Sequence, residues 1–337
     1  MSGHPAELWE SDGGRIRCLL CPHACRIAPG AVGVCGVRRN EDGALIALTY
    51  GRVSSVAVDP IEKKPVFHFH PGTTALSLGS VGCTMKCGHC QNWRISRGGA
   101  DDAVLSELAA AEAVALAGQY GCAGIAFTYN EPVIWAEYVR DTGIAARERG
   151  LYTVMVTNGY ITQAGLDHLA PALDVWRVDV KAMTDEAARR LCGIPSAAPV
   201  LRMAERAMHV HGLHVEVVTN VIPGVNDDEA QLTDLAVWIA DALGPDVPWH
   251  ITRFFPYLEF TDVPPTPLAT LRRTREIGHD AGLRYVYLGN VDEPGGEDTV
   301  CPVCGALAVR RNGFAVLDDR VRDGACPRCG EALGIIG

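Results

Sequence analysis

The sequence lacks long hydrophobic runs, and this absence narrows the classes of protein to consider. Its 337 residues contain no stretch of about 18 consecutive apolar residues, the length that a membrane-spanning helix needs. The first residues contain no apolar core of the kind that marks a secretory signal peptide. We therefore expect a cytoplasmic protein without a membrane-spanning segment.

Positive charge is also scarce. The chain has 30 Lys and Arg residues against 40 Asp and Glu residues, which gives a formal net charge of −10 at pH 7. Proteins that bind nucleic acid regardless of its sequence neutralise phosphates with clustered Lys and Arg, and no such cluster is present. We therefore expect no nucleic-acid partner. The hydrophobic fraction of 48% is that of an ordinary globular protein.

Cysteine is abundant instead, with 13 residues in the chain. Eleven of them fall within residues 18–35, 83–90 and 301–329. Short spacings in a chain without a signal peptide favour metal binding over disulfides. The remaining two, Cys122 and Cys192, are expected to be small buried hydrophobic residues.

The middle group consists of Cys83, Cys87 and Cys90, separated by three and two residues. Three thiolates can hold three irons of a [4Fe–4S] cluster, and no fourth cysteine follows at short spacing. One iron would then be open to another ligand. The alternative is a zinc site that is completed by a distant Cys or His.

The first group combines Cys18, Cys21, Cys25 and Cys35 with His23. Four cysteines within eighteen residues indicate a metal site that holds either zinc or a second iron–sulfur cluster. The spacing does not separate these two, and a loop of unliganded thiols is the remaining alternative.

The last group comprises two C-x2-C pairs, Cys301 with Cys304 and Cys326 with Cys329. Paired motifs of this kind hold zinc tetrahedrally through four thiolates, and an iron site of the rubredoxin type is the alternative. Residues 306–310 and 314–317 are expected to form a hairpin between the pairs. We expect this ribbon to be a structural staple or a docking surface.

From residue 75 onward, short strands alternate with helices, which predicts a parallel α/β sheet. The predicted strands are 75–80, 123–128, 151–157, 175–180, 214–221, 248–254 and 284–288. The predicted helices are 102–118, 131–149, 162–170, 184–192, 199–211, 226–243 and 266–281. In the first helix the apolar face is expected to contain Val104, Leu108, Ala111 and Ala115.

Polar residues follow five successive strands, and in a parallel sheet such positions meet at one edge. They include Asn130 and Glu131, Thr157 and Asn158, Asp179 and Lys181, and Asn220. A single polar strand end is usually a turn or a helix cap. The repetition instead predicts a binding site at the carboxyl ends of the strands.

Taken together, these motifs resemble the radical S-adenosylmethionine (SAM) superfamily. The resemblance includes the Cys83 loop, the segment Asp59 to Pro65 and the run Phe127 to Pro132. Within the superfamily, the chain resembles the radical SAM enzyme of the AmmeMemoRadiSam system, which is similar to pyruvate formate-lyase activating enzymes. The resemblance implies a partial (β/α)6 radical SAM barrel at residues 73–291. A Cys-rich, β-containing extension at 1–72 and a zinc ribbon at 299–334 would flank it.

The resemblance also implies a function. A [4Fe–4S] cluster on Cys83, Cys87 and Cys90 would bind SAM at its open iron and cleave it reductively. The resulting 5′-deoxyadenosyl radical would abstract hydrogen from a substrate that the sequence does not identify. The expected partners are a reductant such as flavodoxin or ferredoxin, together with Memo-like and AMMECR-like proteins.

The shape of SAM suggests which polar residues would bind it. Carbonyl or carboxylate groups near Asn130 and Glu131 suit its amino group, and Lys181, two residues after Asp179, suits its carboxylate. Thr157 and Asn158 suit the ribose hydroxyls, and Asn220 is a further candidate.

Two features leave other functions open. His89 stands where Tyr or Phe is frequent in the superfamily, which affects the expected adenine contacts. The chain also lacks the ferredoxin-like insert that many glycyl-radical activases carry after the cysteine loop. A glycyl-radical activase is therefore one alternative. A non-catalytic metal-binding scaffold that recruits partners through its ribbon is another.

Overall fold

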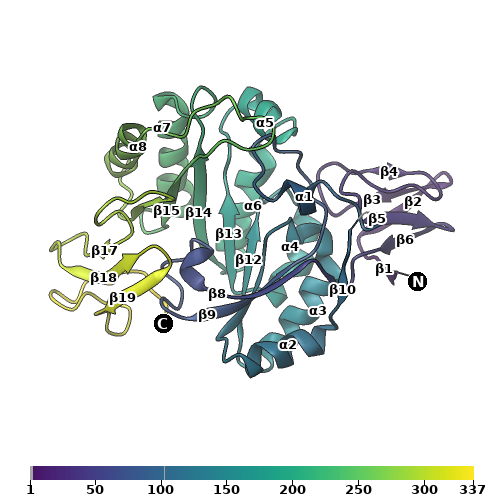
Figure 1. Ribbon diagram of the computed structural model, residues 1–337, viewed down its shortest axis with the longest axis horizontal. Coiled ribbons are helices and arrows are strands. Elements are labelled where there is room, and N and C mark those ends of the chain that lie inside the picture. The colour runs from purple at the N-terminus through teal and green to yellow at the C-terminus, as the bar shows by residue number, and fades with distance from the viewer. Residues whose placement is uncertain (1–2, 102) are drawn as a thin grey trace. The chain divides into compact units, whose positions relative to one another are not determined.

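The computed structural model describes residues 3–101 and 103–337 (Figure 1). The chain forms two compact units. Unit 1 comprises the described residues of Met1–Asp59, Thr74–Trp176 and Ala198–Leu213. Unit 2 comprises Pro60–Thr73, Arg177–Ala197 and His214–Gly337.

Parallel strands form the centre of unit 1. The strand order there is β12-β11-β9-β8, and β9, β11 and β12 run parallel, with Gly124 opposite both Ala75 and Tyr152. Helices α2, α3, α4 and α6 belong to the same unit. The bounds are β8 Ser55–Pro60, β9 Thr74–Gly79, β11 Gly124–Phe127, β12 Tyr152–Thr157, α2 Ala110–Gln119, α3 Ala136–Arg147, α4 Gln163–Leu169 and α6 Ala198–His209.

Unit 2 contains three further parallel strands in the order β14-β15-β16, with Thr219 opposite Ile251. Helix α5 precedes β14 along the chain, α7 lies between β14 and β15, and α8 lies between β15 and β16. The bounds are β14 His214–Val221, β15 Trp249–Arg253, β16 Val286–Gly289, α5 Asp185–Cys192, α7 Glu229–Trp238 and α8 Leu268–Asp280, with a π-helical turn at Ile239–Leu243. Strand β13, Val175–Asp179, contains the boundary between the units.

All seven predicted strands are present, with ends within two residues of the prediction. The burial of these strands explains why the sequence predicted them correctly. Residues of β9 and β11 are almost all buried, as expected for parallel strands that are covered on both faces. The α/β class predicted from the sequence is thereby confirmed.

The prediction of a helix at 102–118 was wrong in its first half. Helix α2 begins at Ala110, where the Glu112 carboxylate accepts a hydrogen bond from the Ala109 amide. Before it, β10 (Ser106–Glu107) pairs with β7 (Arg52–Val53). Val104 is 98% exposed, and the buried face of the helix is formed by Ala113, Val114 and Ala117. Residue 102 lies outside the described residues.

The N-terminal extension is rich in β-structure, as predicted. One antiparallel sheet has the order β1-β6-β5, and another has the order β2-β3-β4. The bounds are β1 His4–Pro5, β2 Trp9–Asp12, β3 Arg15–Cys18, β4 Arg26–Ile27, β5 Arg38–Glu41 and β6 Ala44–Ala47.

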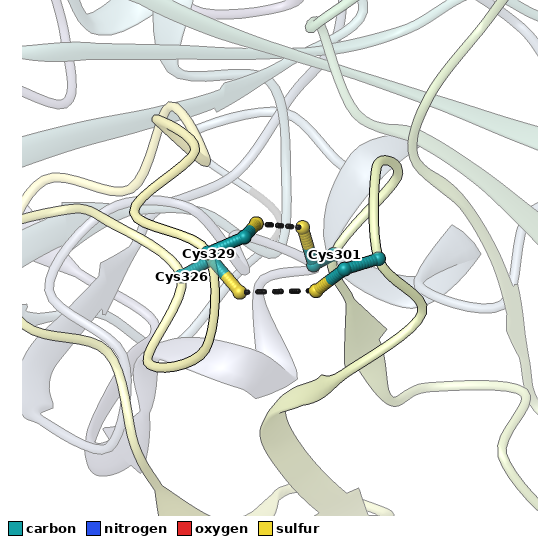
Figure 2. A group of neighbouring side chains, drawn as sticks. Cys301, Cys326 and Cys329 are labelled. Atoms are coloured by element: carbon teal, nitrogen blue, oxygen red, sulfur yellow. Dashed lines mark hydrogen bonds between the residues drawn. The ribbon is translucent and has the colours of Figure 1, made fainter.

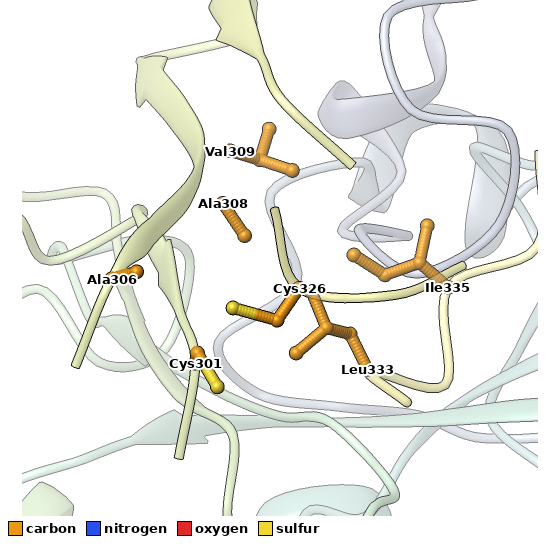
Figure 3. Packing of buried hydrophobic residues seen from close by; sticks show 7 residues of the cluster. All are labelled: Cys301, Ala306, Ala308, Val309, Cys326, Leu333 and Ile335. Carbon is orange, nitrogen blue, oxygen red and sulfur yellow. The ribbon is translucent and has the colours of Figure 1, made fainter. Parts of the chain in front are cut away.

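The C-terminal segment of unit 2 forms the expected small antiparallel sheet, with β17 (Thr299–Val300), β18 (Leu307–Asn312) and β19 (Ala315–Asp319) in sequence order. Its core is small and includes two of the cysteines. Figure 3 shows the cluster, which consists of Cys301, Ala306, Ala308, Val309, Cys326, Leu333 and Ile335. No helix among the described residues is long and apolar enough to cross a membrane.

Candidate functional site

The segment that links β9 to the short helix α1 (Trp93–Ser96) contains Cys83, Cys87 and Cys90, and we call residues 80–92 the cysteine loop. None of the three cysteines forms a disulfide, and all three are half-buried. The loop leaves the carboxyl end of β9, where a site is expected in a parallel sheet. At its start, the Gly82 amide donates to the Ile95 carbonyl at 2.8 Å, which closes the loop on itself.

Asn130, which follows β11, holds the first residues of the cysteine loop. Its Oδ1 accepts a hydrogen bond from the Ser80 amide at 2.9 Å, and its Nδ2 donates to the Gly82 carbonyl at 3.2 Å. Both polar groups of the side chain therefore bind backbone next to Cys83. Asn130 is a positioning residue for the loop, whereas its predicted contact with SAM stays a prediction.

Glu131 is buried, with 2% of its surface exposed, and connects the end of β11 with the end of β12. Its carboxylate accepts hydrogen bonds from Thr157 Oγ1 at 2.6 Å and from the Asn158 amide at 2.8 Å. It also accepts one from the Val133 amide at 3.0 Å. A buried carboxylate with three donors is well compensated, so it can fix the position of Asn158.

Asn158, in turn, lies against the cysteine loop. Its Nδ2 lies 3.5 Å from Cys83 Sγ and 3.0 Å from Thr84 Oγ1, and its Oδ1 accepts from the Tyr160 amide. The Met85 amide also donates to Cys83 Sγ at 3.3 Å. Donors that point at sulfur stabilise the thiolate, which is the form that binds metal.

Electrostatics make metal binding at this loop pH-dependent. Burial raises the pKa of the Cys83 thiol well above its usual value, and the Glu131 carboxylate and the other two thiols add to the effect. The metal-free loop therefore carries a neutral Cys83 at neutral pH, and iron binding must release its proton. Three cysteines on one loop, one of them with N–H donors directed at its sulfur, fit the donor set of a [4Fe–4S] cluster.

Tyr129 is a residue that the sequence reasoning missed. Its φ of 73° lies in the left-handed region, which is costly for an aromatic residue. In this conformation its carbonyl accepts from Asn92 Nδ2 at 2.8 Å, while its hydroxyl donates to Asp59 at 2.6 Å. Tyr129 thus attaches the far end of the cysteine loop to the end of β11. Its position directly after a strand was the available signal.

The other predicted SAM residues lie in unit 2, where the structure brings them together. Lys181 Nζ lies 3.1 Å from Asp179, and Arg177 lies 2.6 Å from the same carboxylate. Burial pushes the pKa of Asp179 up, but the two cations outweigh it, so the net shift is downward.

Asn220 and its neighbour Asn226 extend this group. Asn226 Nδ2 donates to the Lys181 carbonyl at 2.9 Å and to the Asn220 carbonyl at 3.0 Å. Asn220 Nδ2 lies 3.1 Å from Thr252 Oγ1. The ends of β13, β14 and β15 are therefore joined by side-chain hydrogen bonds, whereas the binding site expected there stays a prediction.

The four cysteines of the ribbon also lie together in unit 2 (Figure 2). Cys301 Sγ is 3.6 Å from Cys329 Sγ, and Cys304 Sγ is 3.6 Å from Cys326 Sγ. All four sulfurs lie within 4.8 Å of one another. Tetrahedral zinc with Zn–S bonds of about 2.3 Å would set the sulfurs about 3.8 Å apart. The group therefore fits zinc and is too widely spaced for disulfides.

The segment Pro60–Thr73 supplies buried contacts in unit 2 that the sequence reasoning did not foresee. The Glu216 carboxylate accepts from the amides of Phe67 and His68 at 2.8 to 3.0 Å. Arg311 of the ribbon donates to the Phe67 carbonyl at 2.8 Å and lies over the Phe67 ring. The segment therefore anchors the ribbon to the strands of unit 2.

Comparisons with known proteins agree with these features. Residues 78–236 match the family model described as "Radical SAM superfamily". The chain is 41% identical over 327 residues to the protein named "Uncharacterized protein MJ0808" from Methanocaldococcus jannaschii, and the match covers 96% of this chain and 97% of that protein.

Two further similarities are more limited. The pyruvate formate-lyase 1-activating enzyme of Escherichia coli is 28% identical over 155 residues, which cover 44% of this chain and 61% of that enzyme. A crystal structure of a radical SAM methyltransferase from Sphaerobacter thermophilus aligns with a TM-score of 0.51 at 18% identity over 71% of each chain, which supports the fold alone. With the matching family model and the site geometry, these findings show that the chain is an enzyme of the radical SAM superfamily.

Proposed function

We propose that Cys83, Cys87 and Cys90 hold a [4Fe–4S] cluster whose fourth iron binds SAM. The supporting observation is the set of contacts around Cys83, where Met85 and Asn158 direct N–H groups at the sulfur. Asn130 and Glu131 fix the loop and Asn158 from the ends of the neighbouring strands. No fourth cysteine belongs to the loop, which leaves one iron for SAM.

When bound and reduced, the cluster and SAM supply a 5′-deoxyadenosyl radical that abstracts hydrogen from a substrate. The chain's own residues orient and shield the reactants. Glu131 and Asn130 keep the loop fixed, so the three sulfurs need little rearrangement to accept irons. Asn158 donates to Cys83, which favours the thiolate over the neutral thiol.

We further propose that polar residues after the strands bind SAM. Asp179 pairs with both Arg177 and Lys181, so one negative charge faces two positive charges. Lys181 can therefore also pair with the SAM carboxylate. Asn130 and Glu131 are proposed for the amino group, Thr157 and Asn158 for the ribose, and Asn220 as a further contact. In the ribbon, we propose that the four thiolates bind zinc as a structural ion.

For the substrate and partners, we propose the narrower family that the motifs resemble, the radical SAM enzyme of the AmmeMemoRadiSam system. Memo-like and AMMECR-like proteins are then the candidate partners, and flavodoxin or ferredoxin is the candidate reductant. A glycyl-radical activase is the second candidate, because the E. coli relative is named as an activating enzyme.

Reductive cleavage of SAM tests the proposal directly. The anaerobically reconstituted protein should release 5′-deoxyadenosine from SAM when dithionite is added, measured by liquid chromatography. Cys87→Ala should abolish the product. Cys122→Ala is the matched control, because Cys122 is buried, free and outside the three cysteine groups. Product from the Cys87→Ala protein at the wild-type rate would refute the proposal.

The fate of the abstracted hydrogen distinguishes the two candidate functions, the AmmeMemoRadiSam enzyme and the glycyl-radical activase. The reconstituted enzyme can be incubated with deuterated candidate substrates and unlabelled SAM, or with deuterated SAM and unlabelled partners. Mass spectrometry then follows the label. Label exchanged with a glycine of a partner protein would support the activase, whereas label in a small molecule or in another type of residue would contradict it.

A further inference from the structure

The four N-terminal cysteines of unit 1 surround one cavity. Cys18 ends β3, Cys21 and Cys25 lie in the connection to β4, and Cys35 lies just before β5. All four are free thiols, and Cys18 and Cys35 are buried. Four thiols around a shared space in a β-rich extension form a donor set that neither the cysteine loop nor the ribbon uses.

A backbone amide points at one of these sulfurs. The Val34 amide lies 3.5 Å from Cys25 Sγ. N–H groups directed at sulfur stabilise thiolates and tune the reduction potential of iron–sulfur clusters. Unliganded core cysteines do not require such donors.

Arg38 provides an independent sign of an anionic ligand. It is 1% exposed and lines the cavity. Its two Nη atoms donate to Glu137 at 2.7 and 3.0 Å, and one also donates to the Glu7 carbonyl. Its Nε is buried and has no hydrogen-bond partner among the described residues. Leaving such a donor unsatisfied is costly, so an acceptor in the cavity, such as a cluster sulfide, would complete it.

The separation of the sulfurs distinguishes this group from the ribbon. In the part of the chain that the structure describes, only the ribbon cysteines form a group of three or more candidate ligand atoms within 4.8 Å of one another. A single tetrahedral ion would draw four sulfurs to about 3.8 Å from one another. In a [4Fe–4S] cluster each thiolate binds a different iron, so the four sulfurs lie further apart. The N-terminal group thus fits a cluster better than one zinc ion.

The cavity also adjoins the cysteine loop. His23 Nε2 lies 2.6 Å from the carbonyl oxygen of Thr84, the residue after Cys83. Gly82 has a φ of 86°, and a Cβ at this position would clash with the Cys35 carbonyl oxygen. Covalent bonds and one hydrogen bond therefore connect Cys21 to Cys83.

We propose that Cys18, Cys21, Cys25 and Cys35 hold a second iron–sulfur cluster, which passes electrons to the cluster of the cysteine loop. The relay role rests on the proposed function, whereas the binding site does not. An external one-electron donor of the flavodoxin or ferredoxin class reduces the second cluster. That cluster then transfers the single electron to the first and returns to its oxidised state.

Iron content in a variant without the first site tests the binding. The triple variant Cys83→Ala/Cys87→Ala/Cys90→Ala, reconstituted anaerobically, should retain about four irons per chain and the electron paramagnetic resonance signal of a reduced cluster. The wild type should contain about eight irons. Cys21→Ala/Cys25→Ala should lose the irons of the second cluster and retain those of the first. Cys122→Ala should contain as much iron as the wild type. SAM cleavage is not needed for this measurement.

Three results would overturn the proposal. They are absence of iron from the triple variant, a second zinc per chain in place of iron, and unchanged iron content in Cys21→Ala/Cys25→Ala. The relay has its own test. Cys21→Ala/Cys25→Ala should cleave SAM with dithionite but lose at least about tenfold with reduced flavodoxin, a loss of about 1.4 kcal/mol in transition-state free energy. Equal activity with both reductants would overturn the relay.

Discussion

The ribbon and the cysteine loop both contain cysteines that form no disulfide, but these cysteines are held in different ways. The ribbon sulfurs lie within 4.8 Å of one another and come from two short pairs next to one small sheet. The cysteine loop depends on Asn130, Glu131 and Asn158, which come from the ends of other strands. A closed structural site can be built locally, because its ligands enclose the ion. A site that must leave one coordination position open needs support from outside its own loop.

Removal of the metal from the ribbon should produce the largest effect. It should unfold the ribbon and leave the cysteine loop almost unchanged. Structural zinc contributes on the order of 10 kcal/mol to the folding of small zinc domains. Cys304→Ala should therefore lose zinc and become susceptible to proteolysis near residues 301–329, while SAM cleavage per bound cluster is retained. Cys192→Ala is the control from the same unit. If Cys304→Ala retained all of its zinc, the ribbon cysteines would not be the zinc ligands.

Arg311 shows whether the ribbon also depends on distant residues. It lies 3.8 Å from Glu62, and both side chains are fully buried. Arg311→Met leaves this carboxylate without its cation, which should lower the free energy of unfolding by about 3 to 5 kcal/mol in guanidinium titrations. The neighbouring exposed Arg310 is the control, and Arg310→Met should change stability by less than about 0.5 kcal/mol. Equal effects would contradict the anchoring role.

Glu131→Gln tests the outside support of the cysteine loop. An amide keeps one acceptor but sets an NH2 group against the N–H donors that Glu131 now accepts from. The expected loss of stability is about 3 kcal/mol, with faster loss of iron on dilution. Exposed Glu107→Gln should leave both the free energy of unfolding and the rate of iron loss unchanged. If Glu131→Gln retains iron as firmly as the wild type, the loop does not depend on this carboxylate.

Mild acid should produce the smallest effect, and it acts through unit 2. Burial lowers the pKa of His68 to about 3, whereas in the unfolded chain it titrates near 6.5. The unfolded state therefore binds a proton that the folded state excludes, and stability falls as the pH drops below about 6.5. The loss attributable to His68 should reach about 1.4 kcal/mol at pH 5.5.

The variant His68→Gln should flatten this part of the pH dependence, because an amide can still bond with the Tyr287 hydroxyl but does not titrate. Exposed His209→Gln, measured in parallel, is the control for the exchange of an imidazole for an amide. Urea titrations at pH 7.5, 6.5 and 5.5 measure the effect. An unchanged slope in His68→Gln would show that other groups cause the acid sensitivity.

Much of the fold was predictable because burial leaves a clear pattern in short strands. Strands such as β9 and β11 are buried and largely apolar on both faces, so their ends could be placed within two residues. The start of α2 could not be placed in this way, because alanines fit either face of a helix. There the Glu112 cap and the pairing of Ser106 with Val53 decided the boundary.

The site was predictable in composition but not in its connections. Spacing alone identified the three cysteine groups and the polar strand ends. It could not show that Glu131 binds Thr157 and Asn158, because those contacts join residues 26 and 27 positions apart through the folded sheet. Nor could it reveal the φ of Tyr129, which depends on how the loop closes. The domain boundaries 1–72, 73–291 and 299–334 stay a prediction.

The contact between Arg311 and Phe67 joins residues 244 positions apart, and the Ile336 amide donates to the His68 carbonyl from still further along the chain. A ribosome that adds about 5 to 20 residues per second needs roughly 12 to 50 seconds to synthesise that interval. Throughout this time the nascent segment around Phe67 and Phe69 has no cover from the ribbon. All residues of unit 1 have been synthesised once Leu213 has been added. Synthesis therefore favours early folding of unit 1, while the aromatic segment stays uncovered until the ribbon residues have been synthesised.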